Sequence, residues 1–237
     1  MQVRVATYNM HHGRGTDGII DLPGLAEVIR QSGAEIVGLQ EVDQCTKRSD
    51  GIDQSAELAQ LLGFNCRFAA HFPFQEGYYG VAVITRFPII AARQFWLPTA
   101  PGCEARTLMQ TTVDINGVLT DIYNTHLEVR RQDIRELQCN TVADVLELNT
   151  LPAILTGDMN ATPGQWDLKG RIAGLLWDCD AHGNQFTFPS GAPSKRIDYI
   201  LASSHWTATG SGVRIIDSIR SDHAMVVAEL ALIDKLT

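Results

Sequence analysis

Five short polar motifs, spread over the chain, carry residues that could do chemistry together. Each lies within or directly after an apolar run. They read Thr7-Tyr8-Asn9, Leu39-Gln40-Glu41, Asn124-Thr125-His126, Gly157-Asp158-Met159-Asn160 and Ser221-Asp222-His223, and Arg196-Ile197-Asp198-Tyr199 precedes the last of them. Carboxylate and amide oxygens suit a hard divalent cation, and histidines suit proton transfer near neutral pH. The ordered set therefore suits hydrolysis of a phosphate ester.

Asn9 and Glu41 each end a predicted strand. A buried polar group at such a position costs free energy unless it has a partner. A carboxylate beside a neutral amide is half of a coordination shell for Mg²⁺, which keeps waters that a substrate phosphate can replace. For either residue alone, the simpler interpretation is favoured: an Asn that caps a turn and a Glu that is exposed.

Asp158 and Asn160 follow the apolar run Ala153–Leu155. Because they are two residues apart, their side chains point to the same side of an extended segment. One carboxylate and one amide on that side could hold a nucleophilic water and a phosphoryl oxygen. The alternative is a common turn with an Asx cap.

Two histidines are candidates for acid–base work. His223 adjoins Asp222 and follows Asp198, and a carboxylate that fixes the tautomer of an imidazole helps it to take a proton from water. The sequence does not decide whether Asp198 is the partner of His223. His126 also ends a strand, although a lone histidine is more often structural or exposed.

Three residues are candidates for substrate contact: His12, Arg14 and Arg106. Since adjacent side chains point in different directions, at most one of His11 and His12 is expected to line a site. The glycine-rich segment around Arg14 lacks the Gly-Lys-Ser/Thr of a phosphate-binding loop, so a mobile loop is favoured over a substrate role. Arg106 could clamp a phosphate with two hydrogen bonds or pair with Glu104.

The hydrophobic periodicity predicts strands interspersed with helices. Strands are expected at 3–8, 36–40, 81–85, 107–115, 118–124, 153–156, 197–202 and 224–232, and helices at 22–32, 54–62 and 131–148. Asn116-Gly117 predicts a tight hairpin. Arg130, Arg131 and Arg135 are expected on the solvated surface of the last helix. The mixture favours two mostly antiparallel sheets packed face to face, with helices outside, over a strictly alternating α/β fold.

Composition sets broad limits. The chain has 237 residues, 45% hydrophobic and 19% charged, which fits a single domain over residues 1–237. The net charge of −8 disfavours nucleic acid as a partner without excluding it, because local patches matter more than the total. No apolar run is long enough to cross a membrane, and no signal peptide is evident, so a cytoplasmic location is the default expectation. The five scattered cysteines predict neither a disulfide framework nor a structural zinc site.

Taken in order, the motifs resemble those of the endonuclease/exonuclease/phosphatase superfamily, which includes DNase I, exonuclease III-type nucleases, neutral sphingomyelinases and inositol polyphosphate 5-phosphatases. The likeness runs from Thr7 to about Leu230. It implies a DNase I-like α/β fold, a four-layer α/β/β/α sandwich with the site at one end of two mostly antiparallel sheets. It also implies a phosphate-ester substrate and Mg²⁺ or Mn²⁺ as cofactor.

The resemblance further implies roles for particular residues. It places Asn9, Glu41 and Asp222 at the metal, and His126, Asp158, Asn160, Asp198 and His223 in catalysis. The run from Asn9 to Gly13 is similar to that of small bacterial metal-dependent hydrolases with sphingomyelinase-like features. We therefore expect hydrolysis of a small-molecule or lipid head-group phosphodiester, ahead of a nuclease, a phosphomonoesterase or a non-catalytic binding module. The oligomeric state is left open.

Overall fold

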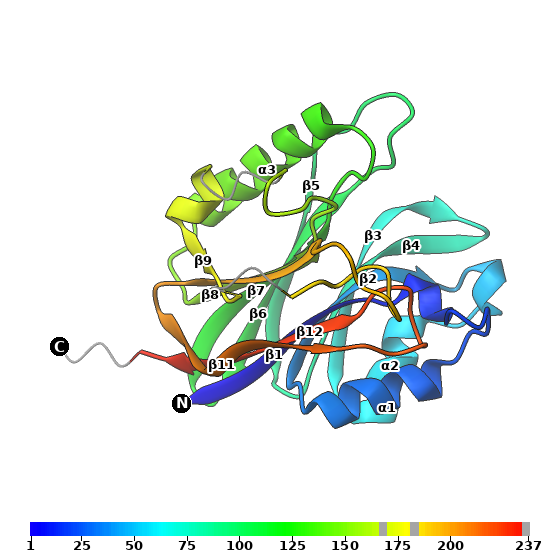
Figure 1. Cartoon of the computed structure of the whole chain (residues 1–237), viewed down its shortest axis with the longest axis horizontal. Coiled ribbons are helices and arrows are strands. Elements are labelled where there is room, and N and C mark those ends of the chain that lie inside the picture. Colours follow the sequence, from blue (N-terminus) through cyan, green and yellow to red (C-terminus); the bar gives the residue numbers. More distant parts are fainter. Residues whose placement is uncertain (166–169, 181–184, 234–237) are drawn as a thin grey trace.

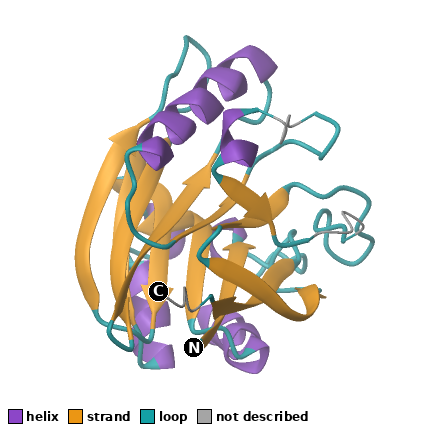
Figure 2. Ribbon diagram, turned by 90° about the vertical axis from the view of Figure 1, so that its left-hand side faces the viewer, coloured by secondary structure: helices purple, strands orange, loops and turns teal. Residues whose placement is uncertain are grey.

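Two six-stranded sheets pack face to face in this computed structural model, which describes residues 1–165, 170–180 and 185–233 (Figure 1, Figure 2). Strand order in the first sheet is β11 (Trp206–Ile216), β12 (Met225–Leu232), β1 (Gln2–Asn9), β2 (Ile36–Gln44), β4 (Gly77–Thr85) and β3 (Asn65–Phe74). Strand order in the second is β5 (Ile89–Trp96), β6 (Thr107–Ile115), β7 (Val118–His126), β8 (Ala153–Asp158), β10 (Asp198–Ser203) and β9 (Leu176–Asp178). The pairs β1–β2 and β7–β8 are parallel, and the other neighbours are antiparallel.

Helices cover the outer face of each sheet. Helices α1 (Leu22–Ser32) and α2 (Gln54–Leu62) bury apolar side chains against the first sheet, and α3 (Gln132–Glu147) does so against the second. Single 3₁₀ turns occur at η1 (His11–Gly13), η2 (Lys47–Ser49) and η3 (Arg171–Gly174). The layers therefore run helix, sheet, sheet, helix (Figure 2), which confirms the fold class expected from the sequence.

Local signals in the sequence set the helix ends. The Asp21 carboxylate accepts a hydrogen bond from the Gly24 amide (2.8 Å) and begins α1, and Gly33 ends it in the left-handed conformation (φ 69°). Asp53 and Gly63 do the same for α2. At the hairpin between β6 and β7, Asn116 and Gly117 both have positive φ (53° and 93°), as the predicted turn requires.

A buried polar bridge joins the two sheets beneath the edge where the motifs lie. The Gln40 amide donates to Asn124 Oδ1 (2.7 Å), and Asn124 Nδ2 donates to the carbonyl oxygens of Leu39 and Ala82 (2.9 Å each). Thr156 donates to the Tyr123 carbonyl (3.0 Å) and also lies within hydrogen-bond distance of Asn124 Oδ1. Because these groups are buried and paired, they hold the ends of β2, β7 and β8 in a fixed relation.

Four strands, β3, β5, β9 and β11, were not predicted from the sequence. Most of β5 is exposed, so it lacks the alternation of apolar and polar residues on which strand prediction depends. The expectation that Arg135 lies on a solvated helix surface was wrong. Arg135 is only 8% exposed, and its Nη1 donates to the Glu128 carbonyl (2.7 Å), whereas Arg130 and Arg131 are exposed. Over the described residues, no helix is long and apolar enough to cross a membrane.

Candidate active site

The polar motifs meet because strand ends from both sheets lie at one edge of the sandwich. Asn9 ends β1 and pairs in register with Gln40 of β2, one residue before Glu41. In the second sheet His126 ends β7 and pairs with Asp158, which ends β8 and pairs with the first residue of β10, Asp198. The hydrogen-bond register of the strands therefore fixes the spacing of these side chains.

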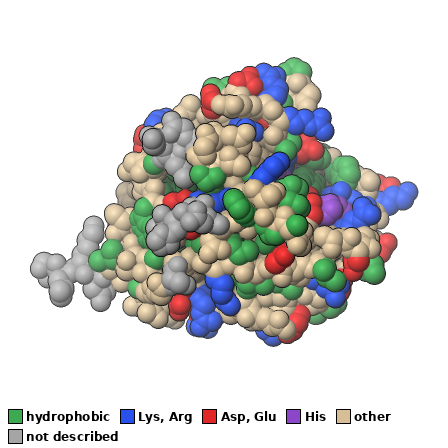
Figure 3. All heavy atoms as spheres, viewed as in Figure 1, with side chains coloured by type: hydrophobic (Ala, Val, Ile, Leu, Met, Phe, Trp, Pro, Cys, Tyr) green, Lys and Arg blue, Asp and Glu red, His purple; other side chains and the backbone are tan. Residues whose placement is uncertain are grey.

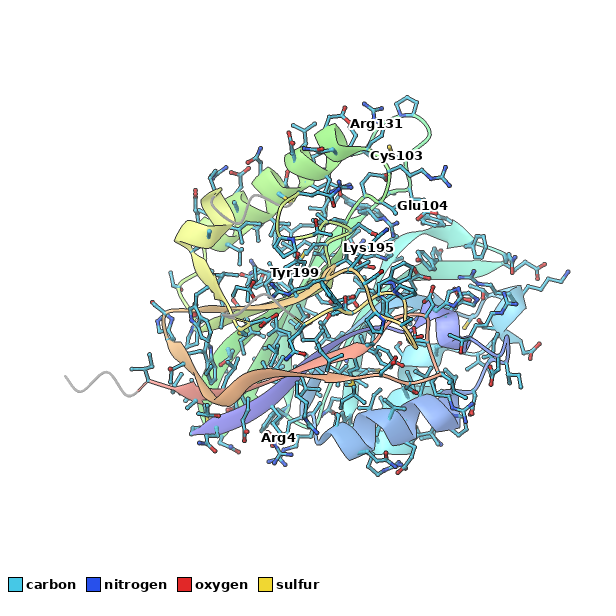
Figure 4. All side chains as sticks on the ribbon, in the orientation of Figure 1. Arg4, Cys103, Glu104, Arg131, Lys195 and Tyr199 are labelled. Atoms are coloured by element: carbon cyan, nitrogen blue, oxygen red, sulfur yellow. The ribbon has the colours of Figure 1, made fainter. Side chains whose placement is uncertain are left out.

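A cavity of about 1050 Å³ opens at this edge. Its walls come from loops of both halves of the chain, and Figure 4 shows two of these contributors, Glu104 and Lys195, on separate loops. On the face of the molecule seen in Figure 3, basic, acidic and apolar side chains lie next to one another. The lining includes His11, His12, Glu41, Arg48, Phe72, Phe74, Tyr79, Glu104, Arg106, His126, Arg130, Asp158, Asn160, Phe188, Lys195, Asp222 and His223.

Asn9 orients two carboxylates at the base of the cavity. Its Nδ2 donates to Glu41 Oε1 (3.1 Å) and to Asp158 Oδ2 (3.0 Å). Its Oδ1 accepts from the backbone N–H of His11 (3.1 Å). Since a backbone N–H can only donate, this contact fixes which end of the amide faces the carboxylates. In this geometry the Asn9 oxygen is already engaged, so Asn9 organises the acidic groups through its nitrogen.

The carboxylate partner of His223 is Asp198. Nδ1 of His223 lies 3.0 Å from Asp198 Oδ2, and both side chains are buried. The other ring nitrogen, Nε2, lies 3.8 Å from Asp158 Oδ2 and faces the cavity base. Asp222, which adjoins His223 in the sequence, lies 3.7 Å from Nδ1 of His11. This resolves the pairing in favour of Asp198.

Burial and charge perturb the two groups that face each other at the base. Burial raises the pKa of the Asp158 carboxyl, and the nearby charge of Asp198 raises it further. Burial opposes the charged form of His223, but the carboxylates of Asp198, Asp158 and Asp222 outweigh it and raise the pKa of that imidazole. Both pKa shifts favour the protonated forms of two groups that face each other at the base of the cavity, and such perturbed groups are typical of sites that transfer protons.

The sequence profile of the Endonuclease/Exonuclease/phosphatase family matches residues 6–223, a span that contains every one of these side chains. The chain belongs to the endonuclease/exonuclease/phosphatase family. It is accordingly a hydrolase of phosphoric esters, as the polar motifs predicted.

Solved structures of other proteins share the fold. An endonuclease/exonuclease/phosphatase from Beutenbergia cavernae is 26% identical, with a TM-score of 0.78 over 98% of this chain and 72% of that one. A mannosyl-6-phosphatase from Bacteroides thetaiotaomicron is 19% identical, with a TM-score of 0.76 over 97% of this chain and 100% of that one. Among curated proteins, protein cwh43 of Schizosaccharomyces pombe is 25% identical over 143 residues, which are 60% of this chain and only 14% of that protein.

A buried arginine, Arg106, sets the tautomer of His126, the second histidine at the base of the cavity, and lowers its pKa. Arg106 is 3% exposed and donates from Nη1 to Nδ1 of His126 (3.2 Å). A guanidinium has no acceptor, so Nδ1 must accept and the ring proton must be on Nε2. That nitrogen lies 3.6 Å from Asp158 Oδ2. Burial, reinforced by the charge of Arg106, holds the pKa of His126 well below its usual range, so His126 is a neutral donor at this site.

Arg106 also pairs with Glu104, as one of the two sequence interpretations proposed: its Nη2 lies 2.9 Å from Glu104 Oε2. Its Nη1 lies 3.5 Å from Nδ1 of the buried His71. Arg106 lines the cavity, and a contact with substrate phosphate stays a prediction.

Asn160 lies just beyond β8 and faces the cavity. Its backbone N–H donates to Asp158 Oδ1 (2.9 Å), and its Nδ2 donates to the Leu127 carbonyl (3.0 Å). The residue adopts positive φ (50°), so the segment has left the extended conformation that the sequence analysis assumed. Asp158 and Asn160 nevertheless reach the same cavity, because the turn carries Asn160 back toward the end of the strand.

The expectation that at most one of His11 and His12 lines the site was wrong. Both line the cavity, with ring centroids 4.6 Å apart. Both residues have φ of 45°, and this left-handed backbone brings adjacent side chains to one side. Arg14, in contrast, is exposed and lies outside the residues that line the cavity.

The structure brings Arg48 of η2 onto an aromatic wall formed by the β3–β4 hairpin, a grouping that was not predicted from the sequence. The Arg48 guanidinium lies over the rings of Phe74 (4.7 Å) and Tyr79 (5.7 Å), and all three line the cavity. Two hydrogen bonds to the buried carboxylate of Asp43 (2.6 and 2.8 Å) hold Arg48 there. These residues lie in different segments, so no local pattern in the sequence could have grouped them.

Proposed function

We propose that this chain is a divalent-metal-dependent phosphodiesterase that acts on a small-molecule or lipid head-group diester. The observation that carries the proposal is the position of His223 at the base of the cavity, 3.0 Å from Asp198 and 3.8 Å from Asp158. Asn9 links this cluster to Glu41. Metal-assisted hydrolysis needs a group that accepts a proton from water and oxygen donors that bind the metal, and both are present here.

The acidic residues fit a hard divalent cation. Glu41 and Asp222 both line the cavity with carboxylates that are not fully buried, and Glu41 is oriented by the Asn9 amide. Oxygen donors with room for water are what Mg²⁺ and Mn²⁺ take in phosphate-ester sites. A cation held by Glu41 and Asp222 would polarise a phosphoryl oxygen and lower the pKa of nearby Asp158 and His223.

The chain's own side chains then have separable roles. His223 accepts the proton of the attacking water at Nε2, while Asp198 holds Nδ1–H and stabilises the imidazolium. Asp158 positions the water between the two histidines. His126 donates Nε2–H to a phosphoryl oxygen, and the remaining N–H of the Asn160 amide is directed at the same cavity.

The cavity supports a substrate larger than a bare phosphate. Its volume of about 1050 Å³ is at the upper end for small-molecule sites. Phe72, Phe74 and Tyr79 offer an apolar wall to one substituent of a diester, and Arg48 and Lys195 offer positive charge. A phosphomonoester is the second candidate, because one structural neighbour is described as a mannosyl-6-phosphatase.

The test compares hydrolysis of bis(p-nitrophenyl) phosphate and p-nitrophenyl phosphate, with Mg²⁺, with Mn²⁺ and with EDTA. The variants are His223→Ala and, as a matched control, His205→Ala, which lies in the turn between β10 and β11. Diester turnover that requires metal and His223, and survives in the control, is the expected result. Preferential turnover of the monoester would replace the diester assignment. Wild-type activity in His223→Ala would refute the assigned base.

A further inference from the structure

The turn after β1 carries two imidazoles beside a carboxylate. One nitrogen of His11, one nitrogen of His12 and one carboxylate oxygen of Glu41 all lie within 4.8 Å of one another. All three residues have positive φ, 45° for both histidines and 57° for Glu41. Left-handed backbone is uncommon for residues other than glycine and costs about 1–3 kcal/mol each. Backbone strain is therefore concentrated at the three residues that supply these donor atoms.

Hydrogen bonds to the backbone hold this strained turn in place. The His11 N–H donates to Asn9 Oδ1 (3.1 Å), and the Gly13 N–H donates to the Met10 carbonyl (2.8 Å). From α2, Gln54 Nε2 donates to the His12 carbonyl (2.8 Å). The surrounding structure therefore fixes the positions of both imidazoles. Strain that is held so firmly is typical of a functional site.

The hydrogen bonds of the rings leave nitrogen lone pairs for a ligand. Nδ1 of His11 lies 3.1 Å from the Arg14 carbonyl oxygen, which can only accept. Nδ1 must therefore carry the proton, so Nε2 has the lone pair. A ring N–H given to a backbone carbonyl is the usual support of a metal-binding histidine. His12 is only 8% exposed, lines the cavity, and has a buried Nδ1 without a hydrogen-bond partner.

We propose that His11, His12 and Glu41 bind a Zn²⁺-class divalent transition metal. Two imidazole nitrogens with one carboxylate are a donor set used by zinc at sites with an open coordination position. Donors on one such ion, each about 2 Å from it, lie roughly 3–4 Å apart, so shifts of about an ångström would complete the site. Nitrogen donors favour Zn²⁺, Co²⁺ or Ni²⁺ over Mg²⁺, which prefers oxygen.

This metal site shares Glu41 with the site proposed for hydrolysis but takes its nitrogen donors from residues that have no role proposed in hydrolysis. The two nitrogen donors lie on η1, which follows β1, whereas Asp198 begins β10 and His223 lies in the loop before β12. Glu41 faces both groups, since Asn9 joins its carboxylate to Asp158. The proposal goes beyond the proposed function and is tested without a phosphate ester, so either can fail while the other holds.

The experiment titrates the metal-free full-length chain with Zn²⁺ by calorimetry and with Co²⁺ by visible absorption, in the presence of excess Mg²⁺. The variants are His11→Asn and His12→Asn, because asparagine tolerates the left-handed backbone that alanine does not. His205→Asn is the matched control, and His223→Ala removes the other cluster that could take the ion. Urea unfolding of each metal-free variant shows whether it is folded.

We expect wild type, His205→Asn and His223→Ala to bind Zn²⁺ alike despite Mg²⁺. His11→Asn and His12→Asn should each weaken binding by about 100-fold or more, because each loses a direct ligand. The visible absorption bands of Co²⁺ that arise from histidine coordination should weaken in the same two variants. Zn²⁺ affinity that is unchanged in folded His11→Asn and His12→Asn would overturn the proposal, as would loss of binding in His223→Ala alone.

Discussion

Neutralising Asp198 isolates the contribution of one buried charge to catalysis. In Asp198→Asn the side chain keeps its size, but the carboxylate that lies 3.0 Å from His223 Nδ1 is replaced by an amide. Asp198 is 1% exposed, so water cannot substitute for the lost charge. The other carboxylate oxygen of Asp198, Oδ1, has no hydrogen-bond partner among the described residues.

The magnitude follows from the separation of the charges. The centres of the carboxylate and of an imidazolium in this contact are about 4 Å apart, which corresponds to about 4 kcal/mol at an effective dielectric constant of roughly 20. If His223 is fully charged in the transition state, the whole of this interaction is lost. At about 1.4 kcal/mol for each tenfold change, kcat should fall by about three orders of magnitude.

The assay measures kcat and KM for bis(p-nitrophenyl) phosphate with saturating Mn²⁺. KM should change little, because the missing interaction forms only as His223 takes up a proton. The matched control is Asp121→Asn, which neutralises another buried carboxylate (2% exposed) at the opposite end of β7, where it accepts hydrogen bonds from Gln110 and Thr112. A loss in Asp198→Asn of less than about threefold, or an equal loss in the control, would refute the assignment of Asp198 as the partner that stabilises charge on His223.

Three further predictions concern stability and its pH dependence, each measured by urea unfolding. Asp43→Asn should cost about 3 kcal/mol, because it leaves Arg48 without the buried carboxylate that accepts two of its hydrogen bonds. Gly38→Ala should cost about 2 kcal/mol, since a Cβ there would lie 2.0 Å from Thr156 Oγ1, and adding Thr156→Ala should recover part of that loss. Burial and the charge of Arg106 hold the pKa of His71 well below 6.5. As the pH falls below 6.5, the unfolded chain therefore binds a proton at His71 that the folded chain does not bind. Stability should therefore fall as pH drops below about 6.5, and His71→Gln should remove about 1 kcal/mol of the loss between pH 6.5 and 5.5.

Each of these has a result that would contradict it. Wild-type stability of Asp43→Asn would mean that the ion pair with Arg48 contributes nothing net. A Gly38→Ala chain as stable as wild type would mean that the two sheets can move apart at no cost. An identical pH dependence for His71→Gln and wild type would mean that His71 becomes protonated in the folded chain.

The sequence by itself determined the strands and helices that carry the motifs. Apolar periodicity located β1, β7 and β8, and the Asp21 cap and Gly33 bounded α1, because these signals depend on neighbours within a few residues. The polar residues at the strand ends could be recognised for the same reason. Their order along the chain also predicted the family, which the match over residues 6–223 confirmed.

Only the tertiary structure decided which of these residues meet and in what chemical state. Asp198 lies 25 positions before His223, and only the folded chain shows that it, and not Asp222, is the 3.0 Å partner. The positions of His11 and His12 depend on positive φ values that long-range hydrogen bonds impose, so the ordinary rule for adjacent side chains predicted their directions wrongly. The tautomer of His126 is likewise set by Arg106, which packs against it from a neighbouring loop.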